Sequence, residues 1–431
     1  MPYILLKNNS GLLNIGDRQE FWAKNAADKG RSRKLAFLVH ERLDNIGGVQ
    51  RHSTRLAQAL SANYAIDRHN WKNPENALPL NFPGLRWRLR NAAANLIYCD
   101  DGLSSIVGTR VAGNSGKKLV ATLHGLDIIA KIPGYQNMIR RSLQKLDKIV
   151  CVSRATCHQA IDRGADPGRI EIIPNAAEPV KEQIARSDGL FDKIRQLTGM
   201  ELTGKKVLFS LGRPVKRKGF DRFIETVFPN LPDNYVYIVA GPRPQMSAFI
   251  QIFNTILPRR TRRNLQIALG NYSIHEQLVK LGNHPRVYYL NGVSDYLRNL
   301  LYAAADLFIM PNVTVPGDME GFGIVALEAS VRGVPVIATG IEGITDAVKD
   351  DQNGFCIKEG DFQGMSRTIQ SLCEHSDRRM VLNNRAKEFV LKEFSIESIA
   401  ARYDRLFRNL IDNNGDMTEK SIKSPSVGGQ E

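Results

Sequence analysis

The chain alternates between short segments that are apolar throughout and longer segments whose apolar residues recur every three or four positions. A short, continuously apolar run is typical of a strand that is buried on both faces of a parallel sheet. Because helical periodicity separates these runs, they predict two doubly wound, Rossmann-like α/β domains in tandem. The expected strands lie at 34–39, 95–99, 118–123, 148–153 and 170–174, and then at 206–212, 235–241, 286–292, 306–311 and 335–340.

Polar stretches between and beyond these two series predict how the chain is divided. The last twenty residues have almost nothing to bury, so we expect them to be disordered. The predicted parts are an extension at 1–33, a first domain at 34–180, a linker at 181–204, a second domain at 205–395, a helix at 396–411 that returns to the first domain, and a tail at 412–431.

Composition changes this picture little. The chain has 431 residues, of which 42% are apolar and 24% charged, as is ordinary for a soluble globular protein. No apolar run is long enough to span a bilayer, and the first residues lack the order of a secretory signal, so a cytoplasmic protein is expected. The five cysteines are scattered and never spaced as CxxC, which favours neither a disulfide framework nor a zinc site.

The loops that follow the strands hold the candidate chemistry, because ligands of such sheets bind beyond the carboxyl ends of the strands. Gly47 and Gly48 open a helix after the first strand, where backbone N–H groups can approach an anion. Arg213 and Lys218 flank a turn after the strand at 206–212, and their charges would together suit a diphosphate. A tight turn without a ligand and a solvated basic loop remain open alternatives.

The segment GDMEGFGIVALEAS places two glutamates, Glu320 and Glu328, on either side of a Gly-Phe-Gly turn. We expect the helix to begin near Phe322 or Gly323, with the amides from Gly321 onward free to meet phosphate. Eight helical residues rise about 12 Å. The two carboxylates would then contact hydroxyls at opposite ends of one nucleotide-sugar, the sugar and the ribose.

Three similar patterns do not fit. The dinucleotide pattern GxGxxA occurs at 321–326, but its glycines follow the strand by ten residues. GNSGKK at 113–118 lacks both the first glycine and the Ser or Thr of a phosphate loop. The acidic pair in DME at 318–320 suggests a metal only vaguely, because no DxD occurs in the chain.

Together these motifs closely resemble the retaining sugar-nucleotide glycosyltransferases of the GT-B fold, in the large family four. The resemblance runs from about residue 34 to residue 410, and each motif is weak alone. A long connection at 245–284, which contains PRRTRR, departs from the family pattern and has no assigned role. In order, the motifs are GGVQRHSTRLAQAL, TLHGLD, IVCVSRAT, IEIIPNAAE, GRPVKRKG, YAAADLFIMP, EGFGIVALEA and GVPVIATGIEGI.

The resemblance implies a role for each matching position. His124 corresponds to a histidine beside the transferred sugar, although a structural bond to a backbone carbonyl stays an alternative for it. Catalytic roles are implied for His124, Glu320, Arg213 and Lys218. Donor binding is implied for Gly48 near the diphosphate, Arg213 and Lys218 on the diphosphate, Glu320 on the sugar, Gly321, Phe322 and Gly323 at the turn, and Glu328 on the ribose.

The implied reaction moves a hexose from a UDP- or GDP-sugar to a glycan or lipid-linked acceptor with retention of configuration, in cell-surface polysaccharide or lipopolysaccharide synthesis. The departing phosphate would take the acceptor proton, and neither a cofactor nor a metal is expected. A sugar-nucleotide epimerase or phosphorylase of the same fold, and a non-catalytic nucleotide-sugar or nucleic-acid binding protein, remain as alternatives.

The net charge of +15 is uneven, with 26 Lys and Arg against 15 Asp and Glu in the first 180 residues. In the GT-B arrangement this half binds the acceptor. Its basic stretches suit anionic lipid headgroups, and we expect peripheral attachment to the inner face of the plasma membrane, although a merely solvated basic face is an equal alternative. No nucleic-acid motif accompanies the charge. The residues expected on this side are Arg86, Trp87, Arg88, Arg141 and Lys145, with 137–148 as an amphipathic helix that also presents Lys148.

Overall fold

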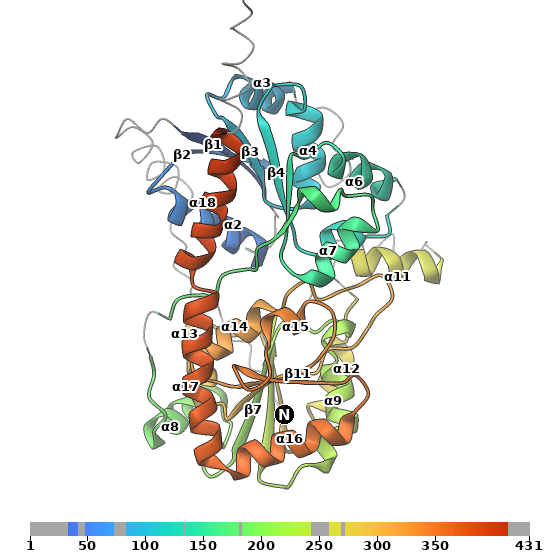
Figure 1. Ribbon diagram of the computed structural model, residues 1–431. Coiled ribbons are helices and arrows are strands. Elements are labelled where there is room, and N and C mark those ends of the chain that lie inside the picture. The colour runs from blue at the N-terminus through green and yellow to red at the C-terminus, as the bar shows by residue number, and fades with distance from the viewer. Residues whose placement is uncertain are drawn as a thin grey trace, which may run out of the picture.

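The computed structural model describes residues 33–41, 48–72, 83–132, 134–180, 183–242, 258–268 and 272–412. Two lobes follow one another along the chain, one built from its first half and one from its second (Figure 1). The predicted extension lies outside the described residues except for Arg33, and the predicted tail does so except for Asp412.

The first lobe holds a six-stranded parallel sheet in the order β2-β1-β3-β4-β5-β6. In β1, Leu35 and Phe37 face one layer of helices and Ala36 and Leu38 face the other, which is why the run is apolar throughout. The strands are β1 (Lys34–Glu41), β2 (Ala65–Lys72), β3 (Leu96–Cys99), β4 (Lys118–Leu123), β5 (Lys148–Cys151) and β6 (Ile170–Ile172). The helices are α2 (Gly48–Leu60), α3 (Pro83–Asn91), α4 (Gly102–Ala112), α5 (Leu126–Ile129), α6 (Tyr135–Leu143), α7 (Arg154–Ile161) and the 3-10 turn η1 (Pro167–Arg169).

The second lobe repeats this plan with the order β12-β11-β10-β7-β8-β9, again all parallel. The strands are β7 (Lys206–Leu211), β8 (Tyr235–Gly241), β9 (Val287–Asn291), β10 (Leu307–Met310), β11 (Val336–Thr339) and β12 (Gly354–Ile357). The helices are α8 (Asp188–Thr198), η2 (Lys216–Lys218), α9 (Phe220–Thr226), η3 (Phe228–Asn230), α11 (Arg259–Ala268), α12 (His275–Leu281), α13 (Asp295–Ala304), α14 (Ile324–Ser330), α15 (Ile344–Ala347), α16 (Phe362–Glu374) and α17 (Ser376–Glu393).

Helices cover both faces of the second sheet. Helices α8, α13, α14 and α17 share one core with Val207 and Phe209 of β7, whereas α9, α12 and α16 share another with Leu208. The chain builds β7, β8 and β9 outward and then returns to β10, so the strand order reverses between β7 and β10. Ligands of open parallel sheets bind at such a reversal, where neighbouring loops leave in opposite directions. The two parallel sheets confirm the predicted fold class of two doubly wound, Rossmann-like domains.

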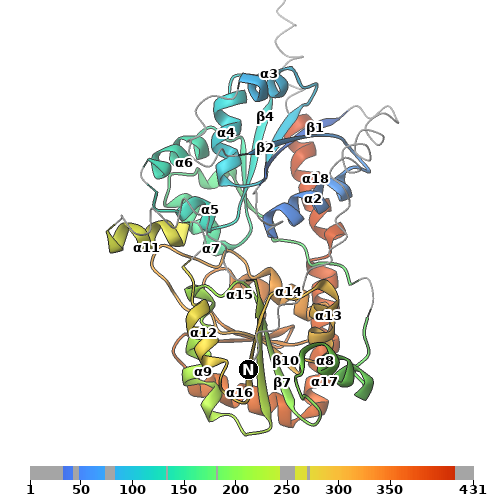
Figure 2. The ribbon, with the colours of Figure 1, turned by 180° about the vertical axis from the view of Figure 1, so that it is seen from behind.

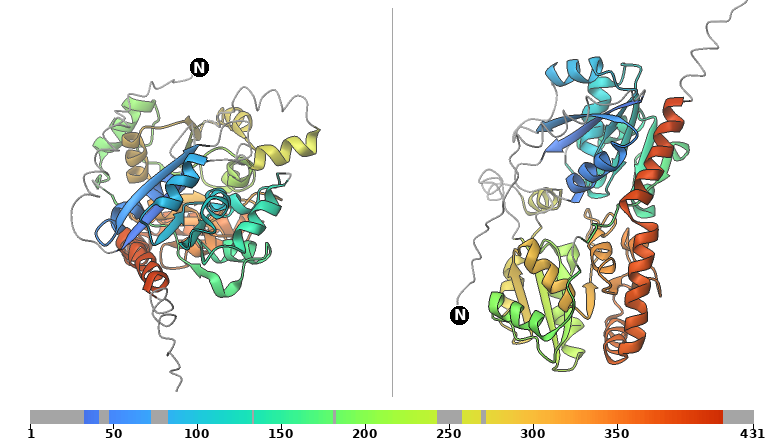
Figure 3. Two further views of the ribbon diagram at one scale, coloured as in Figure 1. Left: turned by 90° about the horizontal axis from the view of Figure 1, so that it is seen from above. Right: turned by 90° about the vertical axis from the view of Figure 1, so that its left-hand side faces the viewer.

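The last helix, α18 (Ile396–Asp412), follows α17 but packs on the first lobe. Together α17 and α18 run along one side of both lobes (Figure 3). Tyr403 and Phe407 enter the core between α2 and β1, and the Tyr403 hydroxyl lies 2.9 Å from that of Thr122 on β4. Helix α18 thus fastens the second half of the chain to the first sheet.

Two edge strands, β2 and β12, were missed. Strand β2 (AIDRHNWK) is largely polar and β12 (GFCI) is only four residues long, so neither shows a long apolar run. The prediction of one amphipathic helix at 137–148 is wrong. Helix α6 ends at Leu143, Lys145 lies in the following turn, and Lys148 begins β5.

Part of the long connection at 245–284 also lies outside the described residues. Its PRRTRR segment forms the start of α11, which projects from the side of the molecule beside α7 (Figures 1 and 2). Across the part of the chain that the structure describes, no helix has both the length and the apolar character needed to cross a membrane.

Candidate active site

The loops after β7 and β10 meet at the strand-order reversal of the second sheet. Gly219 has a φ of 64°, and a Cβ there would lie 2.0 Å from the carbonyl oxygen of Pro311. Only glycine allows both this left-handed conformation and this close approach. The contact sets Lys218, the residue before it, against the segment that leads to Glu320.

Glu320 is the centre of a buried ion-pair cluster. Lys218 Nζ lies 2.6 Å from Glu320 Oε2, and Arg217 Nε lies 3.4 Å from the same oxygen. Asn312 Nδ2 donates a hydrogen bond to that oxygen at 3.2 Å. The side chains of Lys218 and Glu320 are only 9% and 13% exposed, so solvent screens this attraction little.

These contacts decide the protonation states. Burial opposes ionisation of Glu320, but Lys218 and Arg217 outweigh it and lower the pKa of Glu320 to about 2. Burial lowers the pKa of Lys218 despite the attraction of Glu320. Burial also acts against the charge of Arg217, yet Glu320 and Asp318 together raise its pKa. The cluster therefore holds an ionised Glu320 over the whole physiological range.

Two further acids adjoin the cluster. Asp318 Oδ2 lies 3.6 Å from Arg217 Nη1, and burial raises the pKa of Asp318. Glu342, in the loop after β11, accepts a hydrogen bond from the main-chain nitrogen of Glu320 at 2.5 Å. Burial, with repulsion from Glu320 and Asp318, raises the pKa of Glu342 to about 7.

Glu328 lies in a different environment, on α14. It is 7% exposed, and the Tyr302 hydroxyl donates to its Oε2 at 3.3 Å. Burial and repulsion from Glu178 raise the pKa of Glu328, against attraction from Arg298 and from Arg51 on α2 of the first lobe. Residues of both lobes therefore act on the Glu328 carboxylate.

The predicted helical span from Glu320 to Glu328 is wrong. Helix α14 begins at Ile324, and Gly323 precedes it as the N-cap with a φ of 88°. Glu320 lies in the loop before the helix, so the rise of eight helical residues does not describe the separation of the two carboxylates. The left-handed Gly323 turns the chain between them.

His124 faces this cluster from the end of β4. Asp127 Oδ1 accepts a hydrogen bond from the His124 main-chain nitrogen at 2.9 Å, and His124 Nε2 lies 3.0 Å from the carbonyl oxygen of Asp100. This contact with the Asp100 carbonyl is the structural role that the sequence analysis kept as an alternative for His124. The same contact fixes the orientation of the His124 ring. The His52 ring lies 5.9 Å from that of His124, and burial lowers the pKa of His52 to about 3, which keeps it neutral.

The two lobes touch at Gly321. A Cβ on Gly321 would lie 1.7 Å from the carbonyl oxygen of His124, and Thr156 Oγ1 donates to the carbonyl oxygen of Gly321 at 3.4 Å. Nearby, Arg154 Nε lies 2.7 Å from Asp346 Oδ1. The loop after β4 and helix α7 of the first lobe thus pack directly on the segment that carries Glu320.

The other predicted residues are dispersed. Gly48 begins α2, and Arg213 lies in the loop after β7, close enough for its charge to lower the pKa of Lys218. Arg86, Trp87 and Arg88 lie exposed on α3, and Arg141 and Lys145 are exposed at the end of α6.

Sequence reasoning missed four members of the cluster: Arg217, Asn312, Asp318 and Glu342. Arg217 and Asp318 are next to residues that the motifs singled out, so their positions in the sequence could have indicated that they belong to the site. Asn312 lies two residues after the end of β10, in one of the loops that follow a strand. Glu342 lies within the motif GVPVIATGIEGI, but no role was assigned to it, because its partner Glu320 is 22 residues away and the contact is to a main-chain atom.

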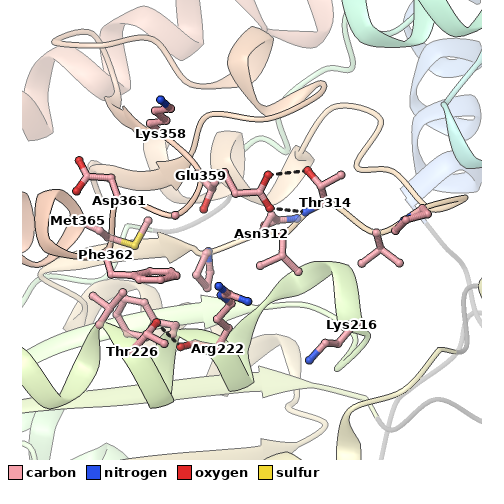
Figure 4. Close-up of a pocket in the computed structure, with 18 of the residues that line it drawn as sticks. Lys216, Arg222, Thr226, Asn312, Thr314, Lys358, Glu359, Asp361, Phe362 and Met365 are labelled. Carbon is pink, nitrogen blue, oxygen red and sulfur yellow. Dashed lines mark hydrogen bonds between the residues drawn. The ribbon is translucent and has the colours of Figure 1, made fainter.

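A cavity of about 400 Å³ lies beyond Asn312, between α9 and the loops after β10 and β12 (Figure 4). Two of its cations have partners: Lys216 pairs with Asp221 at 2.5 Å, and the Arg222 guanidinium stacks on the Phe362 ring at 5.0 Å. Among the residues that the structure describes, no group of three His, Cys, Asp or Glu side chains is arranged to hold a metal ion.

Comparison with known proteins agrees with this arrangement. Residues 63–180 match Glycosyltransferase Family 4 and residues 198–389 match Glycosyl transferases group 1. N-acetyl-alpha-D-glucosaminyl L-malate synthase of Bacillus anthracis is 23% identical over 69% of this chain and 70% of its own length. The lipopolysaccharide core biosynthesis glycosyltransferase LpsE of Rhizobium meliloti is 30% identical over 46% of this chain and 49% of its own length.

Among solved structures, Anabaena HepE in complex with UDP and glucose superposes with a TM-score of 0.66. The match covers 88% of this chain and all of HepE, at 19% identity, and it therefore concerns the fold. The two family segments lie in order on the two lobes, with the buried acid and base cluster where the second lobe meets the first. The chain belongs to the glycosyltransferases of the GT-B fold, with a family 4 segment followed by a group 1 segment.

Proposed function

We propose that this protein is a retaining hexosyltransferase that uses a UDP- or GDP-sugar and acts on a glycan or lipid-linked acceptor in cell-surface polysaccharide or lipopolysaccharide synthesis. The observation that carries the proposal is the buried pair of Lys218 and Glu320 at the strand-order reversal, 2.6 Å apart, with Arg217 beside it. LpsE, named for lipopolysaccharide core biosynthesis, and HepE, crystallised with UDP, support the substrate classes.

The pair suits a nucleotide-sugar because the ligand carries a partner for each member. A sugar hydroxyl can donate to Glu320, and a phosphate oxygen can accept from Lys218. Breaking a buried ion pair without replacement is strongly unfavourable, since it leaves an unpaired buried charge. A donor that supplies both partners at once avoids this penalty, whereas a free sugar or a free phosphate supplies one only.

In the proposed reaction, the bond between the anomeric carbon and the diphosphate oxygen breaks while the acceptor oxygen bonds to the same carbon from the same face. The acceptor proton passes to the departing phosphate oxygen, so the charges balance without a protein base. Lys218, Arg213 and the main chain at Gly321 and Gly323 stabilise the negative charge that develops on the diphosphate. Glu328 accepts hydrogen bonds from the ribose.

The first lobe would hold the acceptor. His124, fixed by Asp100 and Asp127, faces Gly321 across the contact between the lobes. At the far end of this lobe, Trp87 on α3 is 69% exposed, beside the exposed Arg86 and Arg88. An exposed aromatic ring among arginines suits the interface of an anionic membrane, where a lipid-linked acceptor would lie.

Calorimetry against UDP, GDP and their hexose conjugates tests the donor. We expect one nucleoside diphosphate to bind, and then to be released from its sugar conjugate only when an acceptor extract is added. Binding without acceptor-dependent release would indicate a non-catalytic protein, and release with inverted product would contradict retention. Arg213→Ala is expected to weaken diphosphate binding, with Arg195→Ala, an exposed arginine on α8, as the control.

Sedimentation with phosphatidylglycerol vesicles tests the membrane part separately. Each juxtamembrane cation contributes about 1 kcal/mol, so the double variant R86S/R88S should bind about tenfold or more weakly. Binding should also weaken as salt rises. Equal binding to neutral vesicles, or binding indifferent to salt, would contradict the membrane role without touching the transferase proposal.

A further inference from the structure

The loop after β11 holds the main chain of Glu320 at two points. Glu342 Oε2 accepts a hydrogen bond from the Glu320 nitrogen at 2.5 Å, and the Gly343 nitrogen donates to the Glu320 carbonyl oxygen at 3.1 Å. Gly343 lies so close that a Cβ on it would be 2.0 Å from the Gly321 carbonyl oxygen. The residue that carries the central carboxylate is therefore held on both sides by consecutive residues of another loop.

Glu342 adopts an unfavourable backbone conformation to make this contact. Its φ is 49°, and Asp351 is the other described residue besides glycine with a positive φ. Left-handed conformations of non-glycine residues tend to persist at functional sites, where the surrounding contacts enforce them. A glycine would occupy this position without strain, so backbone geometry does not explain the glutamate.

We propose that Glu342 is a positioning residue, which holds the main chain of Glu320 so that its carboxylate meets the sugar of the donor. The proposal rests on the proposed function, because it assigns Glu342 a part in that same reaction. Glu342 does not touch the carboxylate of Glu320 in the contacts described above, but acts through the peptide nitrogen. Small displacements of a positioned group can lower a rate by about 10²-fold.

The neighbourhood of Glu342 also makes its contact sensitive to pH. The acids Glu320 and Asp318 face it together with the cation Arg217, and burial with repulsion from those acids raises its pKa to about 7. An ionised carboxylate accepts a hydrogen bond from N–H more strongly than a neutral carboxyl does. Donor use should therefore improve as pH rises through about 7.

Glu342→Gly and Glu342→Gln test the proposal. E342G removes the carboxylate and relieves the backbone strain, so it should remain at least as thermally stable as E342A while kcat/KM for the nucleotide-sugar falls about tenfold or more. E342Q keeps an oxygen that can accept from the Glu320 nitrogen. It should retain most activity at pH 6 and lack the rise of kcat/KM near pH 7.

Asp351→Gly is the matched control. It relieves the same kind of strain at the other positive-φ residue, which lies exposed in the turn before β12, and it should leave kcat/KM and its pH profile unchanged. A pH profile of E342Q identical to that of the wild type, or full activity of E342G, would overturn the positioning role.

Binding of UDP or GDP, whichever the wild type binds, separates this proposal from the proposed function. E342G should bind the free nucleoside diphosphate as tightly as the wild type does and bind its sugar conjugate more weakly. A wild-type protein that binds neither diphosphate overturns the proposed function. Normal diphosphate binding by both proteins, with equal affinity for the sugar conjugate, overturns the role of Glu342 alone.

Discussion

Glu320 lies in the loop before α14 and Glu328 lies on α14 itself. Their surroundings shift the pKa values of the two carboxyl groups in opposite directions. Glu320 meets Lys218 and Arg217, which lower its pKa to about 2. Glu328 meets a tyrosine hydroxyl, and burial with repulsion from Glu178 raises its pKa. The protein pairs the first carboxylate with cations, which favours its ionised form, whereas burial opposes ionisation of the second.

Removing the cation of the pair should have the largest effect. Lys218→Met keeps the length of the side chain but leaves Glu320 without its nearest cation, and it removes the donor that we propose for the leaving diphosphate. Loss of one preorganised donor of this kind lowers kcat by about 10² to 10³. Single-turnover kinetics measure this effect, and a K218M rate within threefold of the wild type would contradict the role of Lys218.

Glu320→Gln should destabilise the fold itself, because it leaves Lys218 and Arg217 buried with a neutral partner. The expected loss in the free energy of unfolding at pH 7 is about 3 kcal/mol. The folded pKa of Glu320 lies below its ordinary value, so the wild-type advantage is present above that value and is lost as pH falls toward 2. Urea unfolding at pH 7, 5 and 3 measures the decline, and a constant difference would contradict the ion pair.

Glu328→Gln should change stability in the opposite direction. The folded pKa of Glu328 is raised, so its ionisation destabilises the fold above the ordinary glutamate pKa and has no effect well below it. E328Q should be more stable than the wild type at pH 8 and equally stable at pH 4. In calorimetry it should bind the nucleoside diphosphate roughly tenfold more weakly, since the charged acceptor that we propose for the ribose is lost. An E328Q variant less stable than the wild type would contradict the opposite effects that we expect for Glu328 and Glu320.

Asp346→Asn tests the contact between the lobes and should have the smallest effect. The Arg154 side chain is 62% exposed, so solvent screens its pair with Asp346, and the loss should be below about 1 kcal/mol. We expect less than a threefold rise in KM for the donor. In the D346N background, E320Q and E328Q should still change stability in opposite directions. A large loss of kcat would instead place Asp346 in the reaction.

The two sheets were predictable because most of their strands are buried on both faces. In β8, all seven residues from Tyr235 to Gly241 are buried, and such a run is typical of a strand inside a parallel sheet. Edge strand β2 escaped because one of its sides meets no further strand, which permits polar residues, whereas β12 escaped because it is only four residues long. The motif residues Glu320, Glu328, Arg213 and Lys218 were likewise selected by their place after strands.

The sequence alone determined that this chain forms two Rossmann-like lobes and which loops carry their charged residues, because burial and helical periodicity are local patterns that a linear chain displays. Only the tertiary structure decided that Lys218 pairs with Glu320, that Glu342 holds the Glu320 peptide, and that Gly321 touches His124 of the other lobe. Those contacts join residues far apart in the chain, often through main-chain atoms that every residue possesses. Coulomb energies and hydrogen bonds depend on distances of a few ångströms, and such distances are set by packing rather than by spacing along the chain.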